Sequence, residues 1–412
     1  MSHEKKTKTP LDPALSTNLK VLWFGCFMTG TGLSLITPIL PLYIDTLGVF
    51  TKSQLSLWSG LVAASSFLMT AIISPVWGRV ADRYGRKPML IRASLGMSAI
   101  MILTGFAGNV VQLLVMRAVF GLFAGFNSNA IALIAAQTPK EESGRVLGTL
   151  NTALISGVLV GPIFGGAIAQ FFGYSKIFII TGCLIFVAFL TTVALVKENF
   201  TKPEAAGIRT AKEVFAQIKN PGLIIALFVS TLILQMTNMS INPILSLYVR
   251  EIVGNSSNVQ LLAGIVAAVP GAASIFAAPM FGELGDRIGT HKILIFGFSF
   301  AAILFIPMAL VTNVWQLVGL RFLLGIANGA LLPGIQALLS RNTPREATSR
   351  IFSYQQSAQS AGSVIGPLLG GAIAGMLDYK YVFFVTSALA CGNLINVIIS
   401  TRVPKKLKDI SV

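Results

Sequence analysis

Twelve apolar stretches, each about 20 residues or longer, organise this chain, and about 20 residues are what a helix needs to cross a bilayer. They lie at residues 19–43, 54–77, 88–107, 111–136, 146–171 and 176–196, and again at 222–247, 261–282, 293–312, 314–340, 351–376 and 381–401. Lipid offers the backbone no hydrogen-bond partners, so a spanning segment must be a helix or a barrel strand. No stretch shows the alternation of a barrel strand. The sequence therefore predicts an all-α membrane protein with twelve transmembrane helices.

The composition argues against a soluble enzyme. Only 11% of the residues are charged and the mean hydropathy is +0.76, whereas soluble domains carry roughly a quarter charged residues. The cysteines Cys26, Cys183 and Cys391 lie in separate apolar stretches, and the histidines are His3 and His291 alone. There is no ATP-binding glycine loop that ends in Gly-Lys-Ser/Thr. We expect no enzyme activity, no cofactor and no metal site.

The basic residues predict the orientation. With the N-terminus placed in the cytoplasm, 25 of the 31 Lys and Arg residues fall on the cytoplasmic side and four fall outside. Two more, Arg117 and Arg321, lie within helices. This asymmetry follows the positive-inside rule and places both termini in the cytoplasm. The net charge of +16 therefore reflects topology rather than nucleic-acid binding, although contact with anionic lipid headgroups fits the same charges.

The stretches form two groups of six. We expect a cytoplasmic tail at 1–18, a first bundle at 19–196, a cytoplasmic linker at 197–221, a second bundle at 222–401 and a tail at 402–412. Residues 210–219 of the linker predict a short amphipathic helix at the membrane surface.

The two bundles are copies of one unit. With an offset of 204 or 205, Arg117 matches Arg321, and the pattern GxxxGPxxGG at 157–166 returns at 362–371. Because each unit has six helices, both copies have the same orientation, so the sequence predicts parallel repeats about an axis along the membrane normal.

The loop between the second and third stretches reads GRVADRYGRK at 78–87, with a partial copy at 282–292. With this loop and the repeated glycine pattern, the chain resembles the major facilitator superfamily over residues 19–402. Within it, the chain is similar to the twelve-helix drug:proton antiporters, and most to bacterial multidrug resistance exporters of the Mdt type.

The resemblance implies a gating loop that stabilises the outward-facing state and breaks when the transporter opens inward. The alternative is an ordinary basic loop that sets topology. The second copy has Thr290 and His291 in place of Arg86 and Lys87, which predicts a weaker latch. The residues assigned to gating are Gly78, Asp82, Arg83, Gly85, Arg86, Gly282, Asp286 and Arg287.

The glycine pattern matches the antiporter motif of the family, which is associated with export. Glycines four residues apart let another helix approach at backbone distance, here between the first half and the helix at 261–282; plain small-residue packing is the alternative. The motif residues are Gly157, Gly161, Pro162, Gly165 and Gly166, and in the second copy Gly362, Gly366, Pro367, Gly370 and Gly371.

No acidic residue lies near a helix midpoint, which departs from the usual arrangement for proton coupling. The family links the arginine at Arg117 to proton transfer, and the alternative is a side chain that extends to the outer interface. Asp45 is either a proton acceptor or a solvated carboxylate at a helix end. We assign proton coupling to Asp45, Arg117 and Asp82.

A cavity between the halves predicts an apolar, amide-rich substrate site with methionines that adapt to varied shapes. For each residue alone, helix packing is the alternative. The candidates are Phe27, Met28, Asn127, Asn129, Asn151, Gln235, Met236, Met239, Asn242, Asn328, Tyr354, Gln355 and Gln359.

We therefore expect a secondary transporter of the bacterial cytoplasmic membrane that exports lipophilic drugs by proton antiport, with alternating access. The expected partners are small lipophilic substrates, protons and membrane lipid, without nucleic acid, and the chain is expected to act as a monomer. The alternatives are an exporter of one specific metabolite, such as a sugar or a lipid-derived molecule, and a non-transporting sensor on the same fold.

Overall fold

The computed structural model describes residues 12–139, 142–200, 218, 220–254, 258–344 and 347–401. The amphipathic helix expected at 210–219 and the C-terminal tail at 402–412 lie outside the described residues, except for Ile218. The helices of the first half are α1 (Pro13–Ile36), α2 (Leu40–Thr46), α3 (Lys52–Tyr84), α4 (Arg86–Thr104), α5 (Val110–Phe123), α6 (Phe126–Gln137), α7 (Ser143–Phe172) and α8 (Tyr174–Leu195). Those of the second half are α10 (Pro221–Val253), α11 (Val259–Ile288), α12 (Thr290–Met308), α13 (Val314–Arg341), α14 (Thr348–Met376) and α15 (Tyr379–Thr401).

Each predicted stretch corresponds to a helical segment. The first stretch is divided into α1 and α2, and the fourth into α5 and α6. Ten segments of the described chain are long and apolar enough to cross a membrane by length and hydropathy. The other two stretches are α4, whose first turns carry basic residues, and α14, which is rich in serine and glutamine. The chain is an all-helical membrane protein.

The first helix begins earlier than the hydropathy indicated. It starts at Pro13 rather than near residue 19, because the carboxylate of Asp12 accepts hydrogen bonds from the N–H groups of Ala14 (3.1 Å) and Leu15 (3.3 Å). Proline suits the first helical position, where its missing N–H costs nothing. The expected tail at 1–18 is therefore helical from Pro13 onward.

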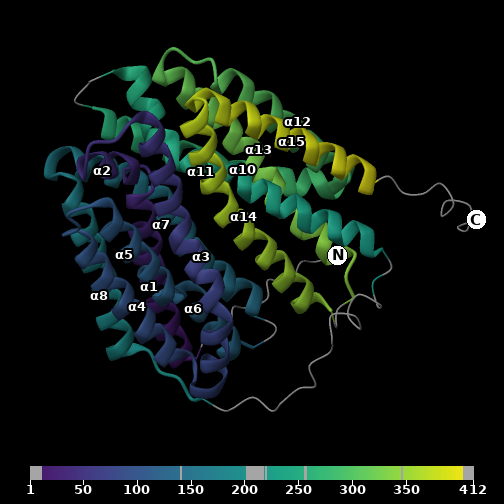
Figure 1. Ribbon diagram of the computed structural model, residues 1–412. Coiled ribbons are helices and arrows are strands. Elements are labelled where there is room, and N and C mark those ends of the chain that lie inside the picture. Colours follow the sequence, from purple (N-terminus) through teal and green to yellow (C-terminus); the bar gives the residue numbers. More distant parts are fainter. Residues whose placement is uncertain are drawn as a thin grey trace, which may run out of the picture.

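The helices pack mainly within two groups. In the first, α1 packs on α7 and α8, and α4 on α5, α6 and α8; in the second, α10 packs on α14 and α15, and α13 on α11 and α12. The groups meet where α3 contacts α14, α7 contacts α11, and α10 contacts α2 and α3. We call the end of the bundle where α1 begins and α15 ends the tail side. The ribbons of the two groups converge near α2, on the side opposite the tail side, and diverge from there (Figure 1).

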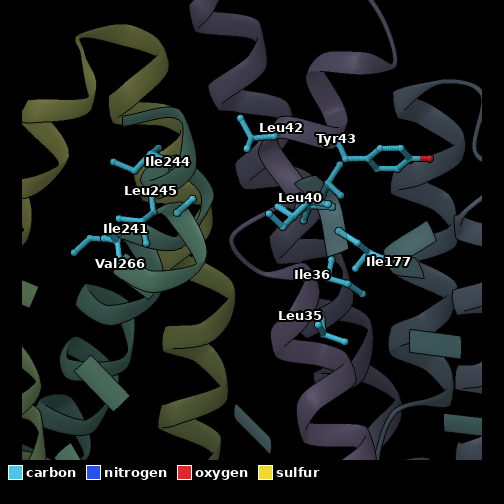
Figure 2. Close-up of a cluster of buried hydrophobic side chains, with 14 of the residues drawn as sticks. Leu35, Ile36, Leu40, Leu42, Tyr43, Ile177, Ile241, Ile244, Leu245 and Val266 are labelled. Atoms are coloured by element: carbon cyan, nitrogen blue, oxygen red, sulfur yellow. The ribbon is translucent and has the colours of Figure 1, made fainter. Parts of the chain in front are cut away.

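One cluster of buried hydrophobic side chains extends over both groups, with Leu35 and Ile177 in the first and Ile241 and Val266 in the second. Figure 2 shows Leu42 and Tyr43 leaving α2 in opposite directions.

The duplication is visible in the tyrosine contacts. The hydroxyl of Tyr43 donates to the carbonyl of Thr104 (3.4 Å), and the hydroxyl of Tyr248 donates to the carbonyl of Met308 (2.9 Å). Tyr248 lies 205 residues after Tyr43, and Met308 lies 204 residues after Thr104, so the two contacts occupy equivalent positions of the repeat.

Candidate functional site

The glycine motif of α7 presents one face to α1. A Cβ atom at Gly157 would lie 2.6 Å from the carbonyl oxygen of Phe27, and one at Gly161 would lie 2.7 Å from that of Thr31. A Cβ at Gly165 would meet the backbone of Leu35. The two helix backbones are therefore in direct contact along three turns, which any side chain on this face would prevent.

The opposite face of the same motif contacts the second half. A Cβ at Gly166 would lie 2.5 Å from the carbonyl oxygen of Gln260, and a Cβ at Gly264 would meet the carbonyl of Pro162. The structure thus forms the seam between the first half and the helix at 261–282 that the sequence predicted. We call this contact of α7 with α11 the first seam.

The second copy repeats both faces. Gly362, Gly366 and Gly370 pack on the backbone of α10, and a Cβ at Gly371 would lie 2.7 Å from the carbonyl oxygen of Ser56 on α3. A Cβ at Gly60 would lie 2.5 Å from the carbonyl oxygen of Pro367. This contact of α14 with α3, the second seam, is related to the first by the internal repeat.

Ion pairs join the halves on the side opposite the tails. Asp45 on α2 pairs with Arg250 on α10 at 2.5 Å. Lys52 on α3 pairs with Glu251 at 2.7 Å and with Asp378 at 2.8 Å. The sequence placed these residues on one side of the membrane but did not predict the pairs. A signal was present, because Asp45 and Arg250 occupy equivalent positions of the repeat with opposite charges.

Asp45 therefore does not match the description of a solvated carboxylate at a helix end. Its side chain is 33% exposed and bound to a cation of the other half, so it is not a freely solvated carboxylate.

At the neighbouring pair of Lys52 and Asp378, burial alone would raise the pKa of Asp378. Hydrogen bonds from Lys52 and from the N–H of Tyr379, with the charges of Lys52 and Lys380, lower that pKa below its ordinary value.

The loop between α3 and α4 has a turn that requires glycine. Gly85 has φ of 95°, a region that side chains strongly disfavour. The carboxylate of Glu198 accepts hydrogen bonds from the N–H groups of Arg86 (2.8 Å) and Lys87 (2.6 Å), which caps the start of α4. Sequence reasoning missed Glu198, since it lies in the linker, over 100 residues from the loop.

The acidic residue of the loop does not reach the other half. Asp82 near the end of α3 pairs at 2.6 Å with Arg86, the first residue of α4 across the Gly85 turn, and its side chain is 61% exposed. The guanidinium of Arg83 lies over the ring of Tyr84. A Cβ at Gly78 would have no atom within 4 Å, so no helix packs on this glycine in the described structure.

The second copy of the loop has an ion pair to another helix that its own sequence did not suggest. Asp286 pairs with Arg341 at the end of α13 (2.6 Å), which links two helices, while Arg287 pairs with Glu283 on its own helix (2.5 Å). An arginine from another helix thus takes the place of the local partner that the second copy lacks, and the weaker second latch stays a prediction. Gly282, like Gly78, has open space around it.

Arg321 is buried and Arg117 is partly buried between helices. The Nε and Nη1 atoms of Arg117 are buried, and no hydrogen-bond partner for them is found among the described residues. Arg321 is 6% exposed, and its Nε donates to the carbonyl of Val266 at 3.3 Å. Both placements agree with a charge facing the protein interior rather than a side chain extended to the outer interface.

The candidate substrate residues fall into two groups. Asn129, Met236 and Gln355 are buried; Asn129 donates to the carbonyl of Gly125 (2.8 Å), and Gln355 donates to Thr231 (3.5 Å). In this conformation these three side chains pack between helices, which was the alternative to substrate binding for each candidate. The partly or fully exposed candidates are Phe27, Met28, Asn127, Asn151, Gln235, Met239, Asn242, Asn328, Tyr354 and Gln359.

Several of the exposed candidates are held in place by neighbours. Gln235 donates to Ser363 on α14 (3.0 Å), and Asn328 on α13 donates to Asn238 on α10 (3.1 Å). The Phe27 ring stacks on Trp23, with centroids 5.6 Å apart. These contacts orient amide groups among α10, α13 and α14 of the second half and aromatic rings along α1 of the first half.

Two repeated helical halves, joined by backbone-to-backbone seams and ion pairs at one side, define a multi-pass helical membrane protein of the transporter type. The chain belongs to the Major Facilitator Superfamily, whose model matches residues 22–240 and 227–411. It is therefore a transporter and not an enzyme.

Relatives and solved structures agree with this assignment. The chain is 45% identical to multidrug resistance protein MdtG of Proteus mirabilis, over 96% of this chain and 99% of that protein. It is 49% identical to MdtG of Salmonella heidelberg, over 92% and 94% of the two chains. A bacterial homologue of the human lysosomal transporter Spinster, in an inward-facing and occupied conformation, matches with a TM-score of 0.80 at 15% identity, over 97% and 99% of the chains. The nucleoside transporter NupG matches with a TM-score of 0.77 at 14% identity, over 94% and 100%.

Proposed function

We propose that this protein exports lipophilic drugs across the bacterial cytoplasmic membrane in exchange for protons. The near full-length similarity to multidrug resistance proteins supports drug efflux. The observation that carries the mechanism is that both seams, and the ion pairs between halves that the described residues form, lie on one side. A transporter that exposes its site alternately to the two sides needs contacts of this kind, which form in one state and separate in the other.

The two halves, 19–196 and 222–401, rock against each other about these seams. With both tails in the cytoplasm, as the basic residues predict, the closed side faces outward and the structure represents an inward-facing state. The isolated Asp82–Arg86 pair supports this, because a gating loop engaged across the halves belongs to the opposite state.

Substrate binds between the halves, at the exposed candidates on α1, α6, α7, α10, α13 and α14. Met28 and Met239 supply soft surfaces that accept different shapes, and the amides of Asn127, Gln235 and Asn242 supply hydrogen bonds without a fixed charge. This chemistry suits lipophilic molecules of varied structure.

Proton coupling uses the first half, at Asp45, Arg117 and Asp82. A proton that enters down a potential of about 100 mV releases ~2.3 kcal/mol, enough to sustain a modest outward drug gradient. The buried guanidinium nitrogens of Arg117 without partners among the described residues support a role for this side chain in charge movement. The protein acts as a monomer.

The test is transport of rhodamine 6G by purified protein in liposomes under an imposed pH gradient. Wild type is compared with Asp45→Asn and Arg117→Ala, with Glu283→Gln as the matched control for loss of an exposed carboxylate. Gradient-driven transport lost in the first two variants and kept in the control supports coupling through the first half. Transport that survives Asp45→Asn excludes that carboxylate and leaves Arg117 and Asp82. Absence of gradient-driven flux with this and further lipophilic dyes in wild type overturns the multidrug proposal in favour of one specific metabolite.

A further inference from the structure

The fourth membrane segment is broken well inside the bundle. α5 ends at Phe123 and α6 begins at Phe126, with Ala124 extended (ψ 161°) and Gly125 at φ 121°. The 14 residues of α5 span about 21 Å at 1.5 Å per residue, so the break lies at membrane depth. Non-helical backbone is tolerated there only where the protein satisfies it or where it lines a cavity.

Two side chains from neighbouring helices satisfy this break. The guanidinium of Arg92 on α4 donates to the carbonyls of Leu122 (3.3 Å) and Ala124 (3.2 Å). The indole N–H of Trp77 on α3 donates to the same Leu122 carbonyl at 2.8 Å. The guanidinium carbon of Arg92 lies 3.8 Å from the centroid of the Trp77 ring, a close cation–π contact.

The charge of Arg92 is suited to this place. The carbonyl groups at the C-terminal end of a helix carry a partial negative charge, and the cation lies at the end of α5. A planar guanidinium can also donate to two carbonyls at once, which a lysine cannot do with fixed geometry.

The internal repeat supplies a comparison within the same molecule. With an offset of 204, Phe281 occupies the position of Trp77 and Phe296 that of Arg92, and their rings contact each other with centroids 5.9 Å apart. In that half the corresponding helix, α13, runs unbroken from Val314 to Arg341. The first copy therefore has both the break and the Trp–Arg pair, whereas the second copy has an unbroken helix and a pair of phenylalanines.

The break changes what the fourth segment contacts. α5 packs on α3 and α4, whereas α6 packs on α1, α4 and α7. At the start of α6, Asn127 accepts a hydrogen bond from Thr29 on α1 (3.0 Å), and Asn129 donates to the carbonyl of Gly125 (2.8 Å). Interrupted helices at membrane depth are common at the substrate sites of transporters.

We propose that Arg92 and Trp77 are positioning residues for transport, which hold the broken fourth segment so that the amide-bearing start of α6 faces the substrate route. The kinetic part of this inference rests on the proposed export function. The structural part stands on the geometry of the break and is tested separately.

The structural test measures thiol labelling of a cysteine at Ala130, which is fully buried on α6, in protein lacking the natural cysteines. We expect Arg92→Ala and Arg92→Lys to raise the labelling rate about fivefold or more, and Trp77→Phe to raise it by about twofold, because it removes one donor and keeps the ring. A cysteine at Ala153, equally buried on α7, reports on general loosening and should be unaffected. Phe296→Ala, at the equivalent position of the unbroken copy, should leave both rates unchanged.

The kinetic test measures rhodamine 6G transport by the same variants. A positioning role raises KM about fivefold in Arg92→Lys with a smaller change in Vmax, whereas a merely structural role lowers Vmax in proportion to the folded protein. The proposal is overturned if labelling at Ala130 stays within about twofold of wild type in the Arg92 variants, or if the two buried cysteines respond equally. If Arg92→Ala does not fold, Arg92→Lys decides. If wild type carries no dye, the labelling result still stands, which separates this inference from the proposed function.

Discussion

Adding one methyl group at Gly166 should open the side of the protein that the ion pairs close. The Cβ of Gly166→Ala would lie 2.5 Å from the carbonyl oxygen of Gln260 and 2.9 Å from the Cα of Leu261. Both neighbours are backbone atoms, so α7 and α11 must separate by about 1 Å to restore normal contact. Overpacking of this kind costs ~1–3 kcal/mol, and the cost falls only on the state in which the first seam is formed.

That cost corresponds to a shift of about 5- to 150-fold in the equilibrium between the two states. The shift is measured as the distance distribution between spin labels at Val49 and Met376, which are exposed on the closed side of the two halves. We expect a new population at longer distance in Gly166→Ala.

Two neighbouring glycines on α7 provide matched controls. Gly148→Ala adds the same methyl group where no atom lies within 4 Å and should leave the distances unchanged, with a gain of roughly 0.5–1 kcal/mol in helix stability. Gly165→Ala faces α1 of the same half, so it should lower the melting temperature without changing the distances. If Gly166→Ala and Gly148→Ala give the same distance distribution, the seam does not control the conformational equilibrium and the reasoning is wrong.

Three further outcomes are expected. Asp45→Arg should destabilise the closed side by up to ~1 kcal/mol, because the lost ion pair is about one-third exposed, and should therefore lengthen the same label distances. Adding Arg250→Asp should restore these distances, and failure of the double variant would exclude a direct pair. Gly85→Ala should lower stability by ~1–3 kcal/mol in thermal unfolding because of its positive φ, whereas Gly78→Ala, with open space around it, should be neutral. Because the pKa of Asp378 is lowered by its ion pair against the effect of burial, that pair favours the closed side at neutral pH and is lost as pH falls through the lowered value. Acidification should therefore lengthen the label distances, and Asp378→Asn should remove that part of the pH dependence.

Much of the fold follows from local patterns. The apolar stretches, the even number of helices per repeat and the offset of about 204 residues are properties of the chain itself. They hold because lipid leaves the backbone no alternative to the helix. The two-faced glycine motif was also predictable, since residues at positions 157, 161 and 165 share one face while Gly166 is turned about 100° from Gly165.

The candidate site was predicted less completely. Glu198 caps α4, Arg341 pairs with Asp286, and Arg92 bridges the break beside Gly125. Each partner is distant in sequence, or lies on another helix, and none belongs to a recognisable motif. The break itself carries no proline, so hydropathy merged α5 and α6 into one stretch.

The amino-acid sequence by itself determined the helical class, the duplication and the residues able to lie at backbone contact, because these depend on hydropathy, spacing and side-chain size. Only the tertiary structure decided which charges meet, which arginines are buried, where a helix is interrupted and which side of the protein is closed. Those features depend on the relative position of two halves that have nearly the same local sequence pattern. A repeat can specify how each copy folds, but the contacts between the copies appear only when both are assembled.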